Sequence, residues 1–253
     1  MLIVLSPAKR LDFESPPHVT AHSQPRFLTQ ARTLVGLLKK LDARELASLM
    51  SISDPLAALN VARYGQWKPP FTPRNARPAL LAFAGDVYEG LDAKSLEEAD
   101  LAWAQDRVRI LSGLYGVLRP LDLIQPYRLE MGTRLENPKG RDLYAYWGQR
   151  LAQAIDEELA THASPILVNL ASAEYFRALG GLRAPVVQPV FQERRADGWK
   201  VMAFAAKRAR GAMTRYAIEE RIDDPLRLQG FDVDGYRFEP AASSETSWVF
   251  RRG

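Results

Sequence analysis

The run Leu111–Thr133, with the sequence LSGLYGVLRPLDLIQPYRLEMGT, limits the possible folds of this chain more than any other stretch. Gly113 and Gly116 enclose two residues, so the backbone there can adopt a positive φ or approach another group closely. Pro120 and Pro126 prevent a long helix from continuing through the run. The pattern predicts a tight loop followed by an irregular crossover.

Two interpretations of this run remain open. In the first, backbone N–H groups of the Gly113–Gly116 loop point at an anion, and Arg119 and Arg128 add planar guanidinium groups suited to phosphate or carboxylate. In the second, the run is a structural crossover whose arginines pair with Asp122 and Glu130.

Short apolar runs elsewhere predict the strands of a sheet. Strands are expected at Leu2–Leu5, Ala79–Ala84, Arg107–Leu111 and Pro165–Leu170. The second, third and fourth of these lead into polar or glycine-rich segments, and the first is stopped by Ser6-Pro7. Such strand ends are where α/β proteins tend to place ligand-binding groups.

The last third of the chain predicts two pairs of strands. Val186–Arg194 and Trp199–Ala205 are joined by Ala196-Asp197-Gly198, and an Asp-Gly turn between such runs indicates a β-hairpin. A final pair of short edge strands is expected around Asp234–Tyr236 and Trp248–Phe250.

Helices are predicted between these strands. Apolar residues at threes and fours predict a helical block over about residues 24–66, in which Asp42 and Glu45 form a capping box and Pro55 lies in the first turn of a third helix. A proline-rich connector follows the block. Further helices are expected at Asp142–Leu159 and Lys207–Ile222. The order of elements predicts an α/β (mixed α+β) fold, with a central mixed, partly antiparallel sheet flanked by helices, in a single domain over residues 1–253.

The composition excludes several kinds of chemistry. The chain has no cysteine and three histidines, so it can form no disulfide, zinc-thiolate site, iron–sulfur cluster or thiol peroxidase. His18 and His22 have the spacing of a metal-ligand pair, but nearby prolines argue against a helix there. We therefore expect no metal site and no cofactor. Glu-x-x-His pairs, which iron-storage bundles use, do not occur.

The chain is expected to be a cytoplasmic protein. Its first residues lack the basic region of a signal peptide, and no apolar run approaches the roughly 20 residues needed to span a bilayer. We expect no membrane partner and a monomeric protein.

The positive charge is concentrated in one segment. The formal net charge is +4, and the segment from 200 to 215 contains Lys200, Lys207, Arg208, Arg210 and Arg215 without an acidic residue. A local positive field of this kind favours a polyanion. The alternative is a basic helix face that is simply solvated.

Polar residues near the predicted strand ends form a second group of candidates. They are Ser6, Lys9, Asp86, Tyr88, Asn169, Ser172 and Tyr175. If the strand ends meet, these side chains can share one pocket. The alternatives are an exposed lysine at position 9 and a helix cap at Ser172.

Several blocks of the sequence resemble the YaaA family of bacterial peroxide stress resistance proteins. They are SPAK at Ser6–Lys9, GDVYEGL at Gly85–Leu91, the run Leu111–Thr133, NLASAEYF at Asn169–Phe176, AKRARGAMTRY at Ala206–Tyr216 and GYRF at Gly235–Phe238. Together they span nearly the whole chain, and the central block is highly specific. At the position before GDVY, where the family often has a polar residue, this chain has Ala84, so no chemistry is expected there.

This resemblance implies a cytosolic protein that limits iron-dependent damage to DNA and protein during hydrogen peroxide stress. It also implies a single-domain mixed fold with a positively charged cleft and DNA binding linked to a helix-hairpin-helix-like element. Leu111–Gly116 is similar to the hairpin of such motifs, although the motif requires a helix where Arg107–Leu111 predicts a strand.

Two functional hypotheses follow. In the first, the protein binds double- or single-stranded DNA without sequence preference, with backbone N–H groups and cations at the phosphates and tyrosines stacking on bases. The residues are Gly113, Tyr115, Gly116, Arg119, Arg128, Lys207, Arg208, Arg210 and Arg215, with Tyr127 and Tyr175 as further stacking candidates. In the second, it is an enzyme or small-ligand binder acting on a nucleotide or damaged base, with Lys9 as nucleophile or electrostatic stabiliser and Asp86 as base. No reaction can be assigned from the sequence.

Overall fold

Strand β1 (Leu2–Leu5) lies in the middle of an eight-stranded sheet and pairs in parallel with β5 (Val108–Ser112) and β8 (Leu167–Asn169). All four residues of β1 are fully buried, as expected for a short apolar strand covered on both faces. The computed structural model describes residues 1–253.

The sheet is parallel in its centre and antiparallel at its margins. Its order is β11-β12-β9-β8-β1-β5-β6, with β10 paired to β9. β12 and β9 also run parallel, whereas the pairs β5–β6, β9–β10 and β11–β12 are antiparallel. The remaining bounds are β6 (Gly116–Leu118), β9 (Val186–Arg195), β10 (Gly198–Lys200), β11 (Arg237–Phe238) and β12 (Ser247–Arg252). The predicted α/β class with a mixed sheet in one domain is confirmed.

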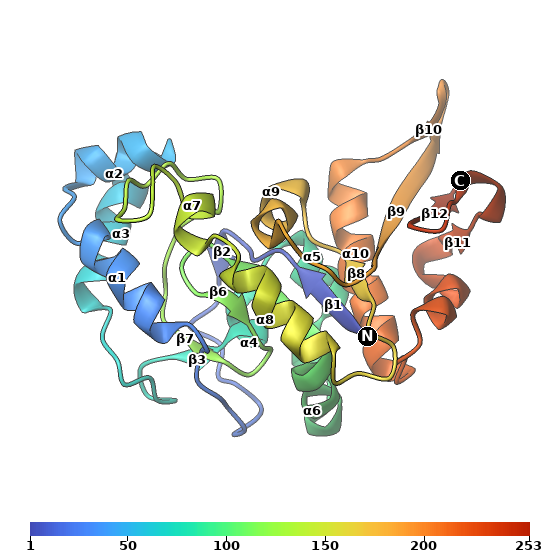
Figure 1. Ribbon diagram of the computed structural model, residues 1–253, viewed down its shortest axis with the longest axis horizontal. Helices are drawn as coiled ribbons and strands as arrows, with labels where there is room; N and C mark the ends of the chain where they lie inside the picture. Colours follow the sequence, from blue (N-terminus) through green and yellow to red (C-terminus); the bar gives the residue numbers. More distant parts are fainter.

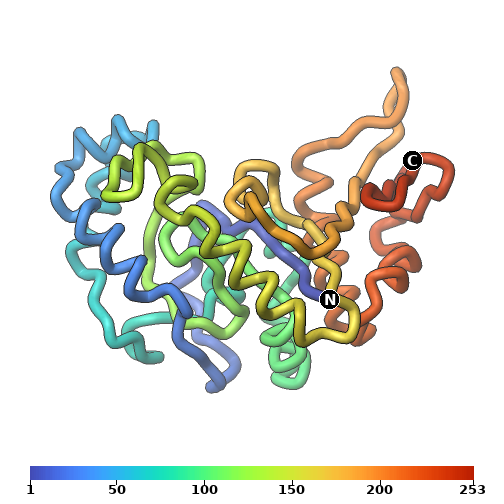
Figure 2. The backbone as a smooth tube through the Cα atoms, viewed as in Figure 1, coloured from blue at the N-terminus to red at the C-terminus, as the bar shows by residue number.

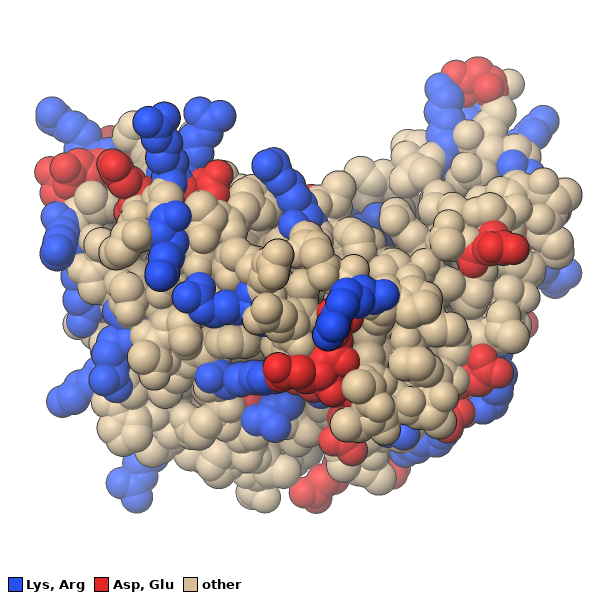
Figure 3. Space-filling model, viewed as in Figure 1, with Lys and Arg blue, Asp and Glu red and all other residues tan.

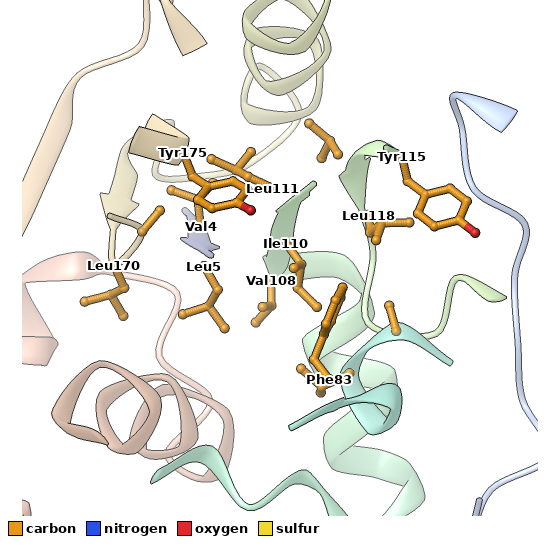
Figure 4. Packing of buried hydrophobic residues seen from close by; sticks show 14 of the residues in the cluster. Val4, Leu5, Phe83, Val108, Ile110, Leu111, Tyr115, Leu118, Leu170 and Tyr175 are labelled. Atoms are coloured by element: carbon orange, nitrogen blue, oxygen red, sulfur yellow. The ribbon is translucent and has the colours of Figure 1, made fainter. Parts of the chain in front are cut away.

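Helices cover both faces of this sheet (Figure 1). On one face α5 (Asp86–Leu91), α6 (Glu98–Arg107) and α10 (Ala203–Glu219) pack together, and on the other lie α8 (Arg150–Leu159) and α9 (Ala173–Phe176). Side chains therefore alternate between two cores: Val4 and Leu111 point to one side, and Leu5, Val108 and Ile110 to the other (Figure 4).

The helical block forms one end of the molecule and the C-terminal strands the other, with the N-terminus near the middle (Figure 2). The block consists of α1 (Leu28–Leu38), α2 (Ala43–Met50) and α3 (Asp54–Gln66). The predicted capping box is present: Asp42 accepts a hydrogen bond from the Glu45 N–H, and Glu45 accepts one from the Asp42 N–H. Pro55 lies in the first turn of α3, as predicted.

Five secondary-structure predictions need correction. Ala79–Ala84, expected as a strand, is one turn of helix α4 (Ala79–Ala82) followed by β4 (Phe83–Ala84), which pairs with β2 (Arg10–Leu11). Every residue of α4 is buried, and a short run that is apolar on all sides does not distinguish a buried strand from a buried helix. The predicted helix Asp142–Leu159 is broken into α7 (Leu143–Trp147) and α8, because Gly148 adopts a φ of 52°.

The other three corrections concern the C-terminal third. The predicted strand Trp199–Ala205 is too long, because β10 ends at Lys200 and α10 already begins at Ala203. The predicted helix Lys207–Ile222 therefore starts earlier than expected, and it ends at Glu219. β12 lies between β9 and β11 and is therefore an interior strand, whereas only β11 is at the edge. Asp234 and Gly235 belong to a 3₁₀ turn instead of a strand.

The remaining elements are short. They are β3 (Arg77–Pro78), β7 (Leu123–Ile124) and the 3₁₀ turns Ala93–Ser95, Arg177–Leu179, Pro225–Gly230, Val233–Gly235 and Pro240–Ala242. None of the helices combines the length and the apolar character required to cross a bilayer.

Candidate functional site

A cavity of about 550 Å³ lies at the carboxyl ends of β1 and β8; we call it the strand-end pocket. Five segments line it: the loop Ser6–Arg10 after β1, Ala84–Glu89 at the start of α5, Tyr127–Glu130, the segment Leu170–Tyr175 around the start of α9, and α10 through Lys207 and Arg210. Among the predicted pocket residues, the structure brings six together in this lining: Ser6, Lys9, Asp86, Tyr88, Ser172 and Tyr175.

A close helix crossing fixes one wall of the strand-end pocket. A Cβ atom at Gly211 of α10 would lie 1.8 Å from the Val87 carbonyl oxygen, and one at Gly90 of α5 would lie 2.1 Å from the Arg208 carbonyl oxygen. Both positions therefore require glycine. The crossing places Asp86 beside Lys207, with 3.7 Å between Oδ2 and Nζ.

Most charges in the strand-end pocket are paired. Glu130 accepts from both Lys9 and Arg128, with 2.9 Å between each nitrogen and its carboxylate oxygen. Arg10 lies 2.7 Å from Glu89. The carboxylate of Glu174 accepts a hydrogen bond of 2.8 Å from the Gly132 N–H. These acids are thus committed to cations or to backbone in the protein itself.

Arg210 is the exception among the cations that line the strand-end pocket. Its guanidinium makes no ion pair and no hydrogen bond within the protein, although its side chain is largely buried between α10 and the pocket wall. Burial lowers the pKa of Arg210 because the charged form loses water without gaining a partner. A desolvated guanidinium without a counterion attracts an anionic ligand.

The hydroxyl groups of the strand-end pocket hold its walls together. Ser6 Oγ accepts a 2.9 Å hydrogen bond from the Ser172 N–H, and the Ser6 carbonyl oxygen accepts one of 2.9 Å from the Tyr88 hydroxyl. Ser172 Oγ caps α9 by accepting from the Tyr175 N–H, so the alternative capping interpretation of Ser172 is confirmed. Burial raises the pKa of both Tyr88 and Tyr175, which keeps the phenols neutral.

The Gly113–Gly116 loop is not a phosphate-binding element, and this prediction is wrong. Residues 111–118 are all buried, and the loop is the turn of the hairpin between β5 and β6, with strands where a helix-hairpin-helix motif requires helices. The close approach predicted for Gly113 does occur, but the group that approaches it is the protein's own backbone and not a ligand. A Cβ atom at Gly113 would lie 2.3 Å from the Leu129 carbonyl oxygen. Tyr115 is fully buried and cannot stack on a base.

The tyrosine at position 115 has a structural role. Its hydroxyl accepts hydrogen bonds from Trp67 Nε1 at 3.0 Å and from the Gln125 N–H at 3.1 Å. Its ring packs edge-on against Tyr127, with 5.1 Å between the ring centroids. The hydroxyl of Tyr127 is itself engaged with Ser112 Oγ at 2.7 Å.

Several predicted phosphate-binding cations are paired elsewhere. Arg119 lies outside the strand-end pocket, 3.0 Å from the buried carboxylate of Asp122, as the crossover interpretation predicts. Arg215 pairs with Glu219 at 2.8 Å and also donates to the carbonyl oxygens of Leu91 and Asp92. Arg208 is exposed and makes no ion pair, but it too lies outside the pocket.

Asn169 does not contribute to the strand-end pocket either. Its side chain is buried, and its Oδ1 accepts a 3.0 Å hydrogen bond from the Ala171 N–H, which shapes the turn after β8. Arg10, Glu89 and Glu174 also line the strand-end pocket and were not predicted from the sequence. All three stand in or next to the motifs SPAK, GDVYEGL and NLASAEYF, so their positions offered a signal.

The basic side chains on the face drawn in Figure 3 are spread widely, with most at the end that carries the helical block. No group of three or more His, Asp or Glu side chains is arranged to hold a metal ion.

Comparison with known proteins gives a consistent result. The family model described as peroxide stress protein YaaA matches residues 1–242. The chain is 56% identical to a UPF0246 protein of Dechloromonas aromatica over 254 residues, which cover 100% of this chain and 99% of that one. It is 58% identical to a UPF0246 protein of Albidiferax ferrireducens, over 100% of this chain and 98% of the relative.

Proposed function

The chain belongs to the YaaA family of peroxide stress proteins, and on that basis we propose that it contributes to peroxide resistance by binding a phosphate-bearing small molecule of the nucleotide class in the strand-end pocket. The proposal rests above all on Arg210. A largely buried guanidinium that lacks a carboxylate needs an anion from outside the protein to offset its lost hydration.

The size and the lining of the strand-end pocket support a ligand of this class. Its volume of about 550 Å³ falls within the range of small-molecule sites. Lys9, Lys207 and Arg210 supply positive charge from two sides. Tyr88, Tyr127 and Tyr175 supply aromatic surface, while their hydroxyl groups are buried or engaged within the protein.

In this proposal Lys9 and Asp86 contact the ligand instead of a metal. Lys9 supplies charge beside Glu130, and Asp86 can accept a hydrogen bond from a ribose or base once Lys207 turns to the phosphate. We attribute protection against iron-dependent damage to the bound nucleotide-class ligand and not to iron held in the pocket. The acids of the pocket, which would be the iron ligands, are already committed to cations or backbone.

Sequence-nonspecific DNA binding is a second candidate function, and Arg208 favours it. Arg208 is exposed on α10, has no acidic partner, and follows Lys207 directly. A duplex or single strand that docks along this side of α10 gains a phosphate contact at Arg208, while Arg210 remains recessed in the strand-end pocket. The two functions therefore depend on different arginines.

A pair of variants separates these functions. We expect Arg210→Gln to weaken the binding of adenosine monophosphate by at least about tenfold in isothermal titration calorimetry, since it removes a charged hydrogen-bond donor. Arg208→Gln serves as the matched control, because it removes the same charge from the same helix outside the pocket. In the same series, Arg208→Gln should weaken and Arg210→Gln should spare the binding of a labelled oligonucleotide at low salt.

The proposal also makes a cellular prediction. Cells that carry Arg210→Gln should lose peroxide resistance, whereas those with Arg208→Gln should keep it unless DNA binding is required. Equal affinity of the wild type and Arg210→Gln for the nucleotide would rule out the strand-end pocket as its site.

A further inference from the structure

A second cavity, of about 460 Å³, carries only positive charge in its lining; we call it the arginine pocket. It lies where the end of α3, the proline-rich connector before β3, the loop after β2 and the segment after β7 meet. The arginines are Arg63 on α3, Arg74 in the connector and Arg77 on β3, and no acidic residue lines the cavity.

None of these three arginines is neutralised. Arg63, Arg74 and Arg77 make no ion pair, and Arg77 donates one hydrogen bond to the carbonyl oxygen of Phe13. The acids on either side of the lining residue Phe13 are not partners of these arginines: the Asp12 carboxylate lies 2.6 Å from Lys94 Nζ, and Glu14 makes no ion pair. The charges of the arginine pocket thus have no counterion within the protein.

Two of the three amides in the lining, Gln125 and Asn75, are committed to the walls. Gln125 accepts from the Lys68 N–H at 2.9 Å and donates to the Lys68 carbonyl oxygen at 3.2 Å. Asn75 accepts from the Thr72 N–H at 2.9 Å and donates to the Pro70 carbonyl oxygen at 3.1 Å. These bonds fix the shape of the connector, so the donors left for a ligand are the guanidinium groups and the exposed amide of Gln66.

The arginine pocket is separate from the strand-end pocket. Two segments of the chain run from one pocket to the other. In the first, Ser6–Arg10 line the strand-end pocket and Phe13 lines the arginine pocket. In the second, Gln125 and Pro126 line the arginine pocket, and residues 127–130 line the strand-end pocket. Arg63 is partly buried. That burial, together with the positive charge of Arg128, lowers the pKa of Arg63.

We propose that the arginine pocket is a second anion-binding site, which takes a small phosphate-bearing molecule with at least two negative charges. Guanidinium forks match phosphate oxygens two at a time, and three forks without counterions favour a multiply charged ligand. Arg63 and Arg77 are recessed in a cavity of small-molecule size, whereas nonspecific duplex binding uses cations on an open surface.

The test uses pyrophosphate as the probe in isothermal titration calorimetry at constant ionic strength, with Arg210→Gln as the background. This background weakens binding at the strand-end pocket and leaves the arginine pocket intact, so failure of the first site and failure of the second give different results. We expect one molecule of pyrophosphate to bind. Adding Arg63→Gln and Arg74→Gln should weaken this binding at least about tenfold.

Arg32→Gln in the same background is the charge-matched control. Arg32 is exposed on α1, makes no ion pair and lies outside the cavity, so its loss should leave the affinity unchanged. Arg74→Gln alone, at an exposed position, should weaken binding without lowering the melting temperature. The proposal is overturned if the Arg210→Gln protein does not bind pyrophosphate, or if Arg32→Gln weakens binding as much as the paired substitutions do. It is also overturned if those substitutions abolish oligonucleotide binding while pyrophosphate affinity stays intact.

Discussion

Lys9 and Arg128 share one carboxylate: Glu130 Oε2 lies 2.9 Å from Lys9 Nζ, and Glu130 Oε1 lies 2.9 Å from Arg128 Nη2. The two cations come from different segments of the lining, Lys9 from the loop after β1 and Arg128 from the segment after β7 that also carries Glu130. Glu130 therefore both joins the walls of the pocket and limits how strongly its cations attract a ligand.

Glu130→Gln should release both cations. We expect the affinity for adenosine monophosphate to rise severalfold, because a negative charge is removed from the pocket. The free energy of unfolding should fall by about 1–3 kcal/mol, because Arg128 is mostly buried and loses its partner. Calorimetry and urea unfolding measure the two effects. Glu89→Gln, which releases only the exposed Arg10, is the control; weaker nucleotide binding by Glu130→Gln would mean that Glu130 itself contacts the ligand.

Gly211→Ala should be strongly destabilising. Its Cβ would lie 1.8 Å from the Val87 carbonyl oxygen, so α5 and α10 must separate, at a cost of about 3 kcal/mol or more in urea unfolding. Gly36→Ala in α1 is the matched control, because no atom lies within 4 Å of the added methyl group. It should stabilise the protein by up to about 1 kcal/mol through helix propensity. Equal effects of the two substitutions would contradict the close crossing.

Asp12→Asn should give a pH-dependent loss of stability. The hydrogen bond from Lys94, followed by that from the Ser15 N–H, holds the pKa of Asp12 well below its usual value. An acid with a lowered folded-state pKa stabilises the protein above its unfolded pKa of about 3.9, and this stabilisation is lost as the pH falls through the folded pKa.

The asparagine variant should therefore be less stable than the wild type by about 1 kcal/mol at neutral pH, since Lys94 is more than half exposed. The difference should shrink below about pH 4. Because the asparagine oxygen can still accept the bonds from the Glu14 and Ser15 N–H groups, the comparison isolates the charge. A difference in melting temperature that stays constant from pH 7 to pH 3 would refute the argument.

Tyr115→Phe should destabilise the protein without changing its binding of nucleotide. The substitution leaves Trp67 Nε1 and the Gln125 N–H without their acceptor in a buried site, which costs about 2 kcal/mol or more. Tyr115 lies outside the strand-end pocket, so nucleotide affinity should match that of the wild type at temperatures where both are folded. Reduced affinity in the fully folded variant would restore a ligand role for Tyr115.

Local patterns in the sequence predicted the elements whose causes are local. The capping box at Asp42 and Glu45, the strand Leu2–Leu5 and the Asp-Gly hairpin depend on residues a few positions apart, and all three are present. The order of strands in the sheet depends on contacts between distant residues, and no local pattern encodes it. The same limit explains Ala79–Ala84, where burial on every side removed the periodicity that separates helix from strand.

The same distinction between local patterns and distant contacts applies to the candidate site. Ser6, Lys9 and Ser172 could be predicted to meet because β1 and β8 are parallel strands that end at a common edge of the sheet. Asp86 follows β4 of a separate two-stranded sheet, so its place in the pocket depends on the packing of α5 against α10. The glycines at 113 and 116 were misinterpreted because a glycine that permits a close approach does not reveal what approaches; at Gly113 it is Leu129. Arg119 pairs with its sequence neighbour Asp122, which the crossover interpretation predicted, whereas only the fold brings the distant Asp92 against Arg215.

The position of β1 at the centre of the sheet also has a consequence for biosynthesis. Leu2–Leu5 emerges from the ribosome before its partners, because β5 begins at Val108 and β8 at Leu167. At the usual rate of about 5–20 residues per second, this apolar strand waits roughly ten seconds or longer for its second neighbour. During that interval it can associate with other nascent chains, so we expect the yield of active protein to depend on translation speed and on chaperones that shield the strand.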